Sequence, residues 1–214
     1  MSSATSANTK RDRLIESAAV LFHRHGMIST SLADIAKHAE IPIGNVYYYF
    51  KTKDELAMAA LEKRRRALEE IYTFLDDSLD DPRERLIHVV RFFDKVKEEY
   101  ARHGCPVYRM IADAGESDKE GVGNAAAGIY GQFVDWAERQ FHVLGHGAEA
   151  RPHALTLLAG IQGAAVMAKS FGNPHIMANE IERLAAWLSA LPNKRIFLGK
   201  AGAGKRGSPS QDAA

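Results

Sequence analysis

Three consecutive tyrosines, Tyr47 to Tyr49, constrain this chain of 214 residues more than any other feature. They lie within a run from Ser31 to Leu56 that reads as two short helices joined by a tight turn, the second of which opens on Pro42. Neighbouring residues of a helix point in different directions, so three adjacent phenol rings cannot all be buried in one core. At least one of them must face solvent or a partner.

Polar residues stand on both sides of these tyrosines. Asn45 precedes them, and Lys51 and Lys53 follow them. An outward aromatic ring between an amide and two lysines suits a DNA groove with phosphates on either side. The run therefore predicts a helix-turn-helix, in which the second helix enters the major groove.

The same run resembles the DNA-binding domain of TetR-family transcriptional regulators, whose signature is G-x-[VL]-Y-x-[YH]-F-x-x-K-x-x-L. The positions that match are Gly44, Val46, Tyr47, Tyr49, Phe50, Lys53 and Leu56. The resemblance implies an all-α protein of about nine helices. In such a protein a three-helix helix-turn-helix domain precedes a larger helical domain for ligand binding and dimerisation. Only residues 9–56 carry a specific motif.

The second helix of the motif supplies the predicted base contacts, because its N-terminal residues lie nearest the base edges. Ile43 suits a thymine methyl group, and Asn45 suits the edge of adenine. Gly44 lets the backbone approach closely, and Tyr48 projects from the same side.

A second set of residues is predicted to contact phosphates, which fix position rather than sequence. The members of this set are Ser31, Tyr47, Tyr49 and Lys53. A structural alternative stands beside this prediction: Tyr49 and Phe50 fill the small core, and Lys53 belongs to a solvated helix start. For Phe50 and Val46 the core position is the expected one.

One residue departs from the family pattern. Glu40 stands in the turn where the family usually has glycine. If that turn needs a positive φ, Glu40 carries backbone strain.

The charge is distributed unevenly, although the chain as a whole is close to neutral. Residues 1–66 hold 11 Lys and Arg against 7 Asp and Glu, whereas residues 67–191 hold 12 against 19. A basic front and an acidic body suit a protein that presents one end to nucleic acid.

Three further features indicate the cellular location of the protein. The N-terminus is polar and does not read as a secretory signal, and the apolar run from Ala154 to Ala168 is too short to cross a bilayer. A single cysteine excludes an intramolecular disulfide. A cytoplasmic protein with no membrane partner is expected.

Helical periodicity runs through the chain, and no segment alternates as a strand does. The expected helices are 9–26, one that starts at 31, then 42–50, 53–79, 82–103, 106–115, 119–144, 152–171 and 174–191. The expected domains are a DNA-binding domain over 9–56 and an effector-binding and dimerisation domain over 57–191. Disordered tails are expected over 1–8 and 192–214.

The larger domain shows no catalytic signature, such as a phosphate-binding glycine loop or a nucleophile elbow. The resemblance instead implies an effector pocket lined by apolar side chains. The candidates for the pocket or for a sensor within it are Phe93, Cys105, Tyr108, Trp136 and Met167.

Cys105 lies between Gly104, which ends one helix, and Pro106, which opens the next. It is therefore the predicted N-cap residue, and the positive end of a helix dipole stabilises a thiolate. The junction resembles that of TetR-family members that sense electrophiles or oxidants through a cysteine. The alternative is a small buried residue that fills a helix junction.

A pair of histidines raises the question of a metal. His142 and His146 lie one helical turn apart, but the sequence shows no cysteine or carboxylate at ligand spacing beside them. A favourable interaction with the helix C-terminus is the expected role. Neither a metal nor another cofactor is predicted.

The resemblance also implies that the last two helices pair with those of a second chain as a four-helix bundle. The stripe on 174–191 consists of Ile181, Leu184, Leu188 and Leu191. A homodimer supplies the two heads that a palindromic operator needs.

The sequence thus predicts a dimeric DNA-binding regulator, most simply a repressor. A small-molecule or thiol-reactive inducer is expected to release it from double-stranded DNA. The competing class is a small all-α ligand carrier or enzyme without specific DNA binding. The tyrosine-rich helix and the lack of acid–base or nucleophile patterns weigh against that class.

Overall fold

The computed structural model describes residues 9–116 and 120–193, and every regular element within them is a helix. The all-α prediction is confirmed. The α-helices are α1 Lys10–His25, α2 Leu32–His38, α3 Ile43–Tyr49, α4 Lys53–Ser78, α5 Pro82–Phe92, α6 Lys97–His103, α7 Pro106–Glu116, α8 Glu120–Val143, α9 Ala150–Phe171 and α10 His175–Ala190. The predicted tail over 1–8 and almost all of the one over 192–214 lie outside the described residues.

The structure has one more α-helix in the described part than the nine expected, because the segment from Pro82 to His103 is not continuous. A 3₁₀ turn at Phe93–Val96 separates α5 from α6. Neither proline nor glycine occurs in this turn, so local sequence does not mark the break. The ring of Phe93 instead packs edge-on against Phe92 and Tyr100, with centroids 5.9 and 6.2 Å away.

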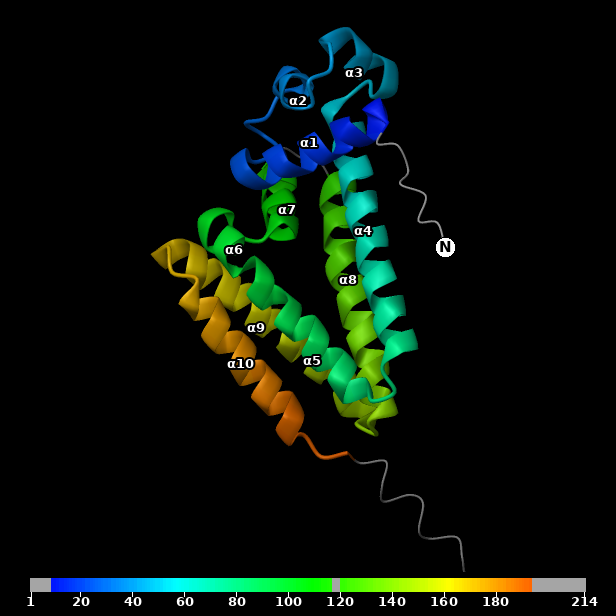
Figure 1. Ribbon diagram of the computed structural model, residues 1–214, viewed down its shortest axis with the longest axis vertical. Coiled ribbons are helices and arrows are strands. Elements are labelled where there is room, and N and C mark those ends of the chain that lie inside the picture. Colours follow the sequence, from blue (N-terminus) through cyan, green and yellow to red (C-terminus); the bar gives the residue numbers. More distant parts are fainter. Residues whose placement is uncertain (1–8, 117–119, 194–214) are drawn as a thin grey trace, which may run out of the picture.

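Helices α1 to α3 form a small head at one end of the molecule (Figure 1). Two capping boxes start α1 and α2: Thr9 pairs with Asp12, and Ser31 pairs with Asp34. Each hydroxyl accepts a backbone N–H, and each carboxylate accepts the N–H of the capping residue. The shared core of the head consists of Leu14, Ala18, Phe22, Ile35, Val46 and Phe50.

The turn between α2 and α3 is a Schellman motif. Ile41 N–H donates to the Ala36 carbonyl at 2.9 Å, and Glu40 N–H donates to the Lys37 carbonyl at 3.2 Å. Glu40 has a φ of 54°, the only positive φ of a non-glycine residue in the described chain. The positive φ on which the expected strain depends is therefore present.

The remaining helices form the body. The long helix α4 leaves the head and runs beside α8, while α9 packs against both α8 and α10 (Figure 1). Between α4 and α8, Tyr72 and Trp136 stack with ring centroids 4.7 Å apart. The packed pair α4 and α8 leads from the head along the body.

Helix α7 joins the body to the head from below. The Asp113 carboxylate accepts the backbone N–H of Met27, just after α1. Arg109 donates to the His25 carbonyl at 3.0 Å and lies 3.4 Å from Asp113. We call Arg109 and Asp113 the α7 clamp, because together they hold the C-terminal end of α1.

Helix α9 is longer than the apolar run seen in the sequence. With the preceding 3₁₀ turn it spans Gly147–Phe171. This segment is long and apolar enough to cross a membrane by length and composition alone. Within its most apolar stretch of 18 residues, 33% is buried inside the protein. Its buried side packs on α8, α10 and α6. Its outward side exposes Leu155, Val166 and Met167.

The residues predicted to pair α10 with a second chain occupy a different place. Leu184 and Leu188 are 0% and 1% exposed within a single chain, and Ile181 is buried as well. These side chains fill the body core because α10 packs on α5 and α9. The prediction that this stripe forms the dimer face is therefore wrong.

The strain at Glu40 yields a test of stability. A left-handed residue costs about 1–2 kcal/mol unless it is glycine, and glycine's freedom in the unfolded chain offsets part of that gain. Glu40→Gly should raise the free energy of unfolding by about 0.5–1 kcal/mol in urea titrations. Glu40→Ala is the matched control, since it removes the charge and keeps the strain. A control variant as stable as Glu40→Gly would show that the strain is not the cause.

Candidate nucleic-acid interface and effector cavity

Helix α3 turns one row of side chains away from the rest of the protein. Tyr48 is 77% exposed. No other large hydrophobic side chain in the described residues is as exposed. Tyr47 and Ile43 are also exposed, and Asn45 is half-buried. Residues three and four apart share a helix face, so Gly44, Asn45 and Tyr48 form one outward group.

Gly44 has no evident structural role inside the chain. A Cβ atom at this position would meet no heavy atom of the described residues within 4 Å, and its φ is not positive. Neither packing nor backbone conformation therefore requires glycine there. The absence of a side chain at Gly44 instead allows another molecule to approach the backbone closely.

The inner side of α3 anchors it to the head. Val46 and Phe50 are buried, as expected. Tyr49 is half-buried, packs on the core, and meets the Tyr48 ring edge-on at 4.9 Å. The guanidinium of Arg11 lies 5.1 Å from the centre of the Phe50 ring, a cation–π distance.

Two predicted phosphate ligands have internal partners. The Ser31 hydroxyl caps α2, as described above. The Lys53 ammonium donates to the carbonyls of Met27, Ile28 and Thr30 at 2.6, 3.3 and 2.9 Å. All three N–H bonds of an ammonium are thus accounted for, so Lys53 braces the loop between α1 and α2. Lys51 is exposed, with its ammonium on the Tyr47 carbonyl at 2.6 Å.

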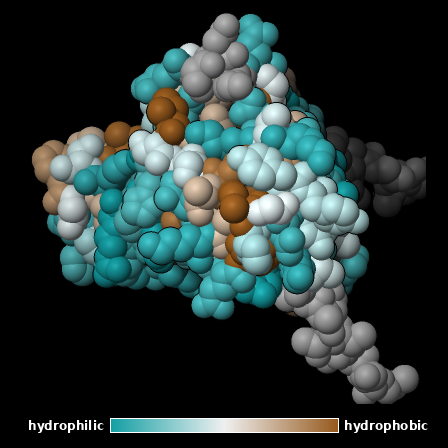
Figure 2. Space-filling model, turned by 90° about the horizontal axis from the view of Figure 1, so that it is seen from above, coloured by the Kyte–Doolittle hydropathy of each residue, from teal (hydrophilic) through white to brown (hydrophobic). Residues whose placement is uncertain are grey.

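The surface seen from the head end is mainly hydrophilic, with small separate hydrophobic patches (Figure 2). An interface with DNA is polar and wet rather than broadly apolar. This surface fits that pattern.

Cys105 lines a small cavity in the body. The cavity has a volume of about 60 Å³. Its walls include Arg64, Tyr72, Phe93, Tyr100, Tyr130, Phe133 and Gln162. Sites for drug-sized ligands are about 300–1,000 Å³, so this one is too small to hold such a ligand without rearrangement.

A chain of hydrogen bonds crosses this cavity. The Tyr130 hydroxyl donates to the Gln162 Oε1 at 2.8 Å, and the Cys105 Sγ lies 3.3 Å from the same hydroxyl. A phenol has only one proton, so the thiol is the donor to Tyr130. Burial is the main cause that raises the pKa of Tyr130 above its usual range, and Tyr130 is therefore neutral. Sequence periodicity gave no sign of this pairing.

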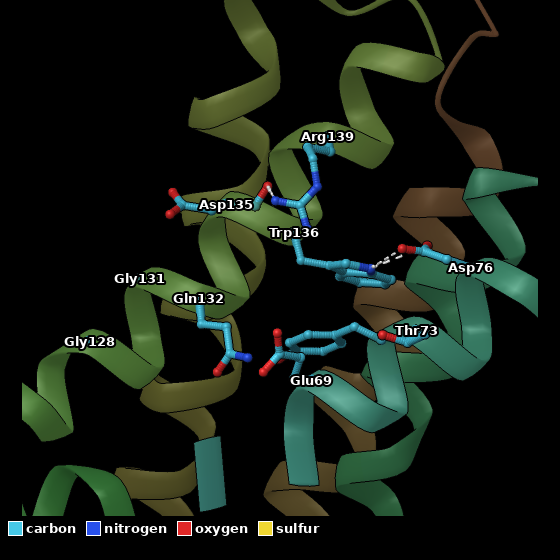
Figure 3. A pocket seen from close by; sticks show the side chains of 10 residues that line it. Glu69, Thr73, Asp76, Gly128, Gly131, Gln132, Asp135, Trp136 and Arg139 are labelled. Atoms are coloured by element: carbon cyan, nitrogen blue, oxygen red, sulfur yellow. Dashed lines mark hydrogen bonds between the residues drawn. The ribbon is translucent and has the colours of Figure 1, made fainter. Parts of the chain in front are cut away.

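The other predicted pocket residues lie elsewhere. Trp136 borders a separate hollow of about 580 Å³ between α4 and α8, where its indole N–H lies 3.2 Å from Asp76 (Figure 3). Met167 is 47% exposed on the outer side of α9. Tyr108 borders an outer groove of about 370 Å³ together with Cys105 and Lys169. Of the five predicted residues, the cavity brings together only Phe93 and Cys105.

The junction at Cys105 contacts the head directly. The His23 ring, on α1, donates from Nε2 to the Gly104 carbonyl at 2.8 Å. On the other side, Lys169 of α9 covers Gly104 so closely that a Cβ there would lie 3.0 Å from Lys169 Cδ. Gly104 has a φ of 80°, which also favours glycine.

His142 and His146, which the sequence places one helical turn apart, have different neighbours in the structure. His142 Nε2 lies 3.6 Å from Glu138, on its own helix. The expectation that no carboxylate accompanies His146 is wrong, because the Glu149 carboxylate lies next to it, together with His153. Glu149 follows His146 by three residues in a 3₁₀ turn, and His153 follows Glu149 by four residues in the first turn of α9.

Comparisons with known proteins agree with this geometry. Residues 14–60 match the family of bacterial regulatory proteins named tetR. This span holds most of the head and the start of α4. Residues 14–60 form the N-terminal DNA-binding domain of the tetR family.

Relatives extend the likeness beyond the head. An uncharacterized HTH-type transcriptional regulator of Mycobacterium tuberculosis is 26% identical over 170 residues, 74% of this chain and 84% of that protein. The HTH-type transcriptional repressor NemR of Escherichia coli is 25% identical over 169 residues, 74% and 83% of the two chains. A TetR transcriptional regulator of Legionella pneumophila has the same fold, with a TM-score of 0.75, 16% identity, and coverage of 86% and 99%.

The contact between His23 and Gly104 predicts a pH dependence. Burial is the main cause that lowers the pKa of His23 below its usual 6.5. The unfolded chain therefore binds the proton more readily, and stability is lost as the pH falls through about 6.5. Between pH 7.5 and 5.5 the free energy of unfolding should fall more steeply in the wild type than in His23→Gln. Parallel pH profiles for the two proteins would contradict a neutral, buried His23.

Proposed function

We propose that this TetR-family regulator is a homodimeric repressor that binds a palindromic operator through α3 of each chain. The observation that carries the proposal is the outward group of Gly44, Asn45 and Tyr48. The Tyr48 ring of this group is exposed, and neither packing nor backbone conformation within the chain requires glycine at position 44. Side chains of these types read base edges and thymine methyl groups in the major groove.

The division into two domains is part of the proposal. The DNA-binding domain covers residues 9–56 and the effector and dimerisation domain covers 57–191. The boundary falls inside α4, so that helix transmits displacement of the body to the head. A regulator that acts on bacterial DNA works in the cytoplasm.

The outward side of α9 is the proposed dimer face. Leu155, Val166 and Met167 are exposed there beside the small residues Ala159 and Gly163. A groove of about 510 Å³ between α9 and α10 continues this face. Small residues let helices approach closely, and apolar ones lose contact with water on association. In this assignment the exposed apolar side chains of α9 lie in a protein–protein contact.

The inducer is proposed to act at the Cys105 cavity. A ligand or a covalent adduct that exceeds about 60 Å³ must displace the walls. Displacement of the junction acts on His23 and α7, and so on the position of the head. Release requires that the modified protein prefer the non-binding arrangement by a few kcal/mol.

Substitutions on α3 test the DNA contact. Tyr48→Ala and Asn45→Ala should each weaken binding to DNA from around the protein's own gene by about 1–3 kcal/mol, because each removes a base contact. Fluorescence anisotropy at fixed salt gives the affinities, and circular dichroism checks the fold. Tyr108→Ala, an exposed tyrosine of the body, is the control. Unchanged affinity in both α3 variants would refute α3 as the recognition helix.

The dimer face has its own test. Val166→Glu places a charge on the proposed contact but leaves the chain's own core intact, so it should give a folded monomer with weak operator binding. Light scattering during size-exclusion chromatography measures the mass. Phe74→Glu, at an exposed position on α4, should remain dimeric. A monomeric wild type at micromolar concentration, or a dimeric Val166→Glu, would contradict the assignment.

Cys105 is tested with an alkylating reagent. Because the chain has one cysteine, any thiol adduct forms at that residue. Treatment should release the wild type from its operator and leave Cys105→Ser bound, as followed by gel shift. Equal release of both proteins would mean that Cys105 is structural and that the inducer binds without a covalent bond.

A further inference from the structure

The corner between α8 and α9 lies at the end of the molecule opposite the head (Figure 1). Three side chains meet at this corner. They belong to His146, Glu149 and His153, and one ligand atom from each lies within 4.8 Å of the others. Two imidazole nitrogens and one carboxylate oxygen form a common ligand set for zinc and related metals. None of these residues takes part in the proposed DNA contact or in the cavity.

The backbone explains why the three residues converge. Helix α8 ends in a Schellman motif: Gly145 has a φ of 89°, and His146 N–H donates to the Phe141 carbonyl at 3.1 Å. A 3₁₀ turn at Gly147–Glu149 follows, and residues three apart are eclipsed in such a turn. Helix α9 then places His153 one α-helical turn after Glu149.

The surroundings give the cluster one fixed side and one open side. His146 is only 4% exposed, and its ring packs against Phe141 with centroids 5.9 Å apart. His153 is half-buried against Trp187, with centroids 5.4 Å apart. Glu149 is exposed. An ion can therefore approach past the carboxylate and meet two imidazoles that are already oriented.

We propose that His146, Glu149 and His153 bind one divalent first-row transition metal ion per chain, of the class of Zn²⁺, Ni²⁺ or Cu²⁺. Imidazole suits these ions better than it suits Mg²⁺ or Ca²⁺. Three protein ligands leave a position open for water. The ion ties the end of α8 to the start of α9, and it stabilises the folded state by mass action.

The test uses the full-length chain without an affinity tag, freed of metal with a chelator. Isothermal titration with Ni²⁺ should give one ion per chain, together with a rise in melting temperature. His153→Gln should weaken the binding at least about tenfold, since even outer-shell groups of metal sites contribute that much. His142→Gln is the matched control, because His142 lies at the same corner on a different partner, and it should bind like the wild type.

Glu149→Gln keeps the test decisive if His153→Gln folds poorly, because this exposed residue can change without disturbing the core. It should also weaken Ni²⁺ binding at least about tenfold. Absence of saturable binding by the wild type would overturn the proposal. So would equal binding by Glu149→Gln, or a loss of binding in His142→Gln, since the ion would then be held by other groups.

Discussion

Two polar side chains of α7 hold the C-terminal end of α1 against the body. Asp113 is buried and accepts the Met27 N–H, while Arg109 reaches the His25 carbonyl. A buried, hydrogen-bonded charge is costly to leave without its partners. Gly26 is part of this arrangement, because a Cβ there would lie 2.7 Å from the Asp113 carboxylate. The head therefore sits on the body in a defined orientation.

This clamp is the proposed route by which the body influences DNA binding. Cys105 precedes α7 directly, so a displacement at the cavity would act on the helix that holds α1. His23 adds a second contact, from α1 to the Gly104 carbonyl. A small cavity inside close-packed helices cannot enlarge without moving its walls. Effector binding and head orientation are thus proposed to share the helix junction at 103–106.

Local chemistry explains which features could be predicted from sequence. Short-range rules predict helix capping by Thr9 and Ser31, burial of Val46 and Phe50, and the unfavourable backbone conformation of Glu40. The remaining features depend on tertiary packing. Leu184 and Leu188 form an apolar stripe that suits a core or an interface equally, and Lys53 finds its carbonyl partners more than twenty residues away. Glu149 follows His146 by three residues and His153 follows Glu149 by four, in a 3₁₀ turn and the start of α9, so they lie outside the helix that contains His142.

The central claim, that the α7 clamp sets the head for operator binding, is tested most directly by operator affinity in Asp113→Asn. Asp113 lies in the body, and α3 is unchanged in this variant. Weaker binding by about tenfold or more is predicted, with folding confirmed by circular dichroism. Glu99→Gln is the matched control, because the Arg24–Glu99 ion pair also joins head and body but is exposed and contributes little. An unchanged operator affinity in a folded Asp113→Asn protein would contradict the account.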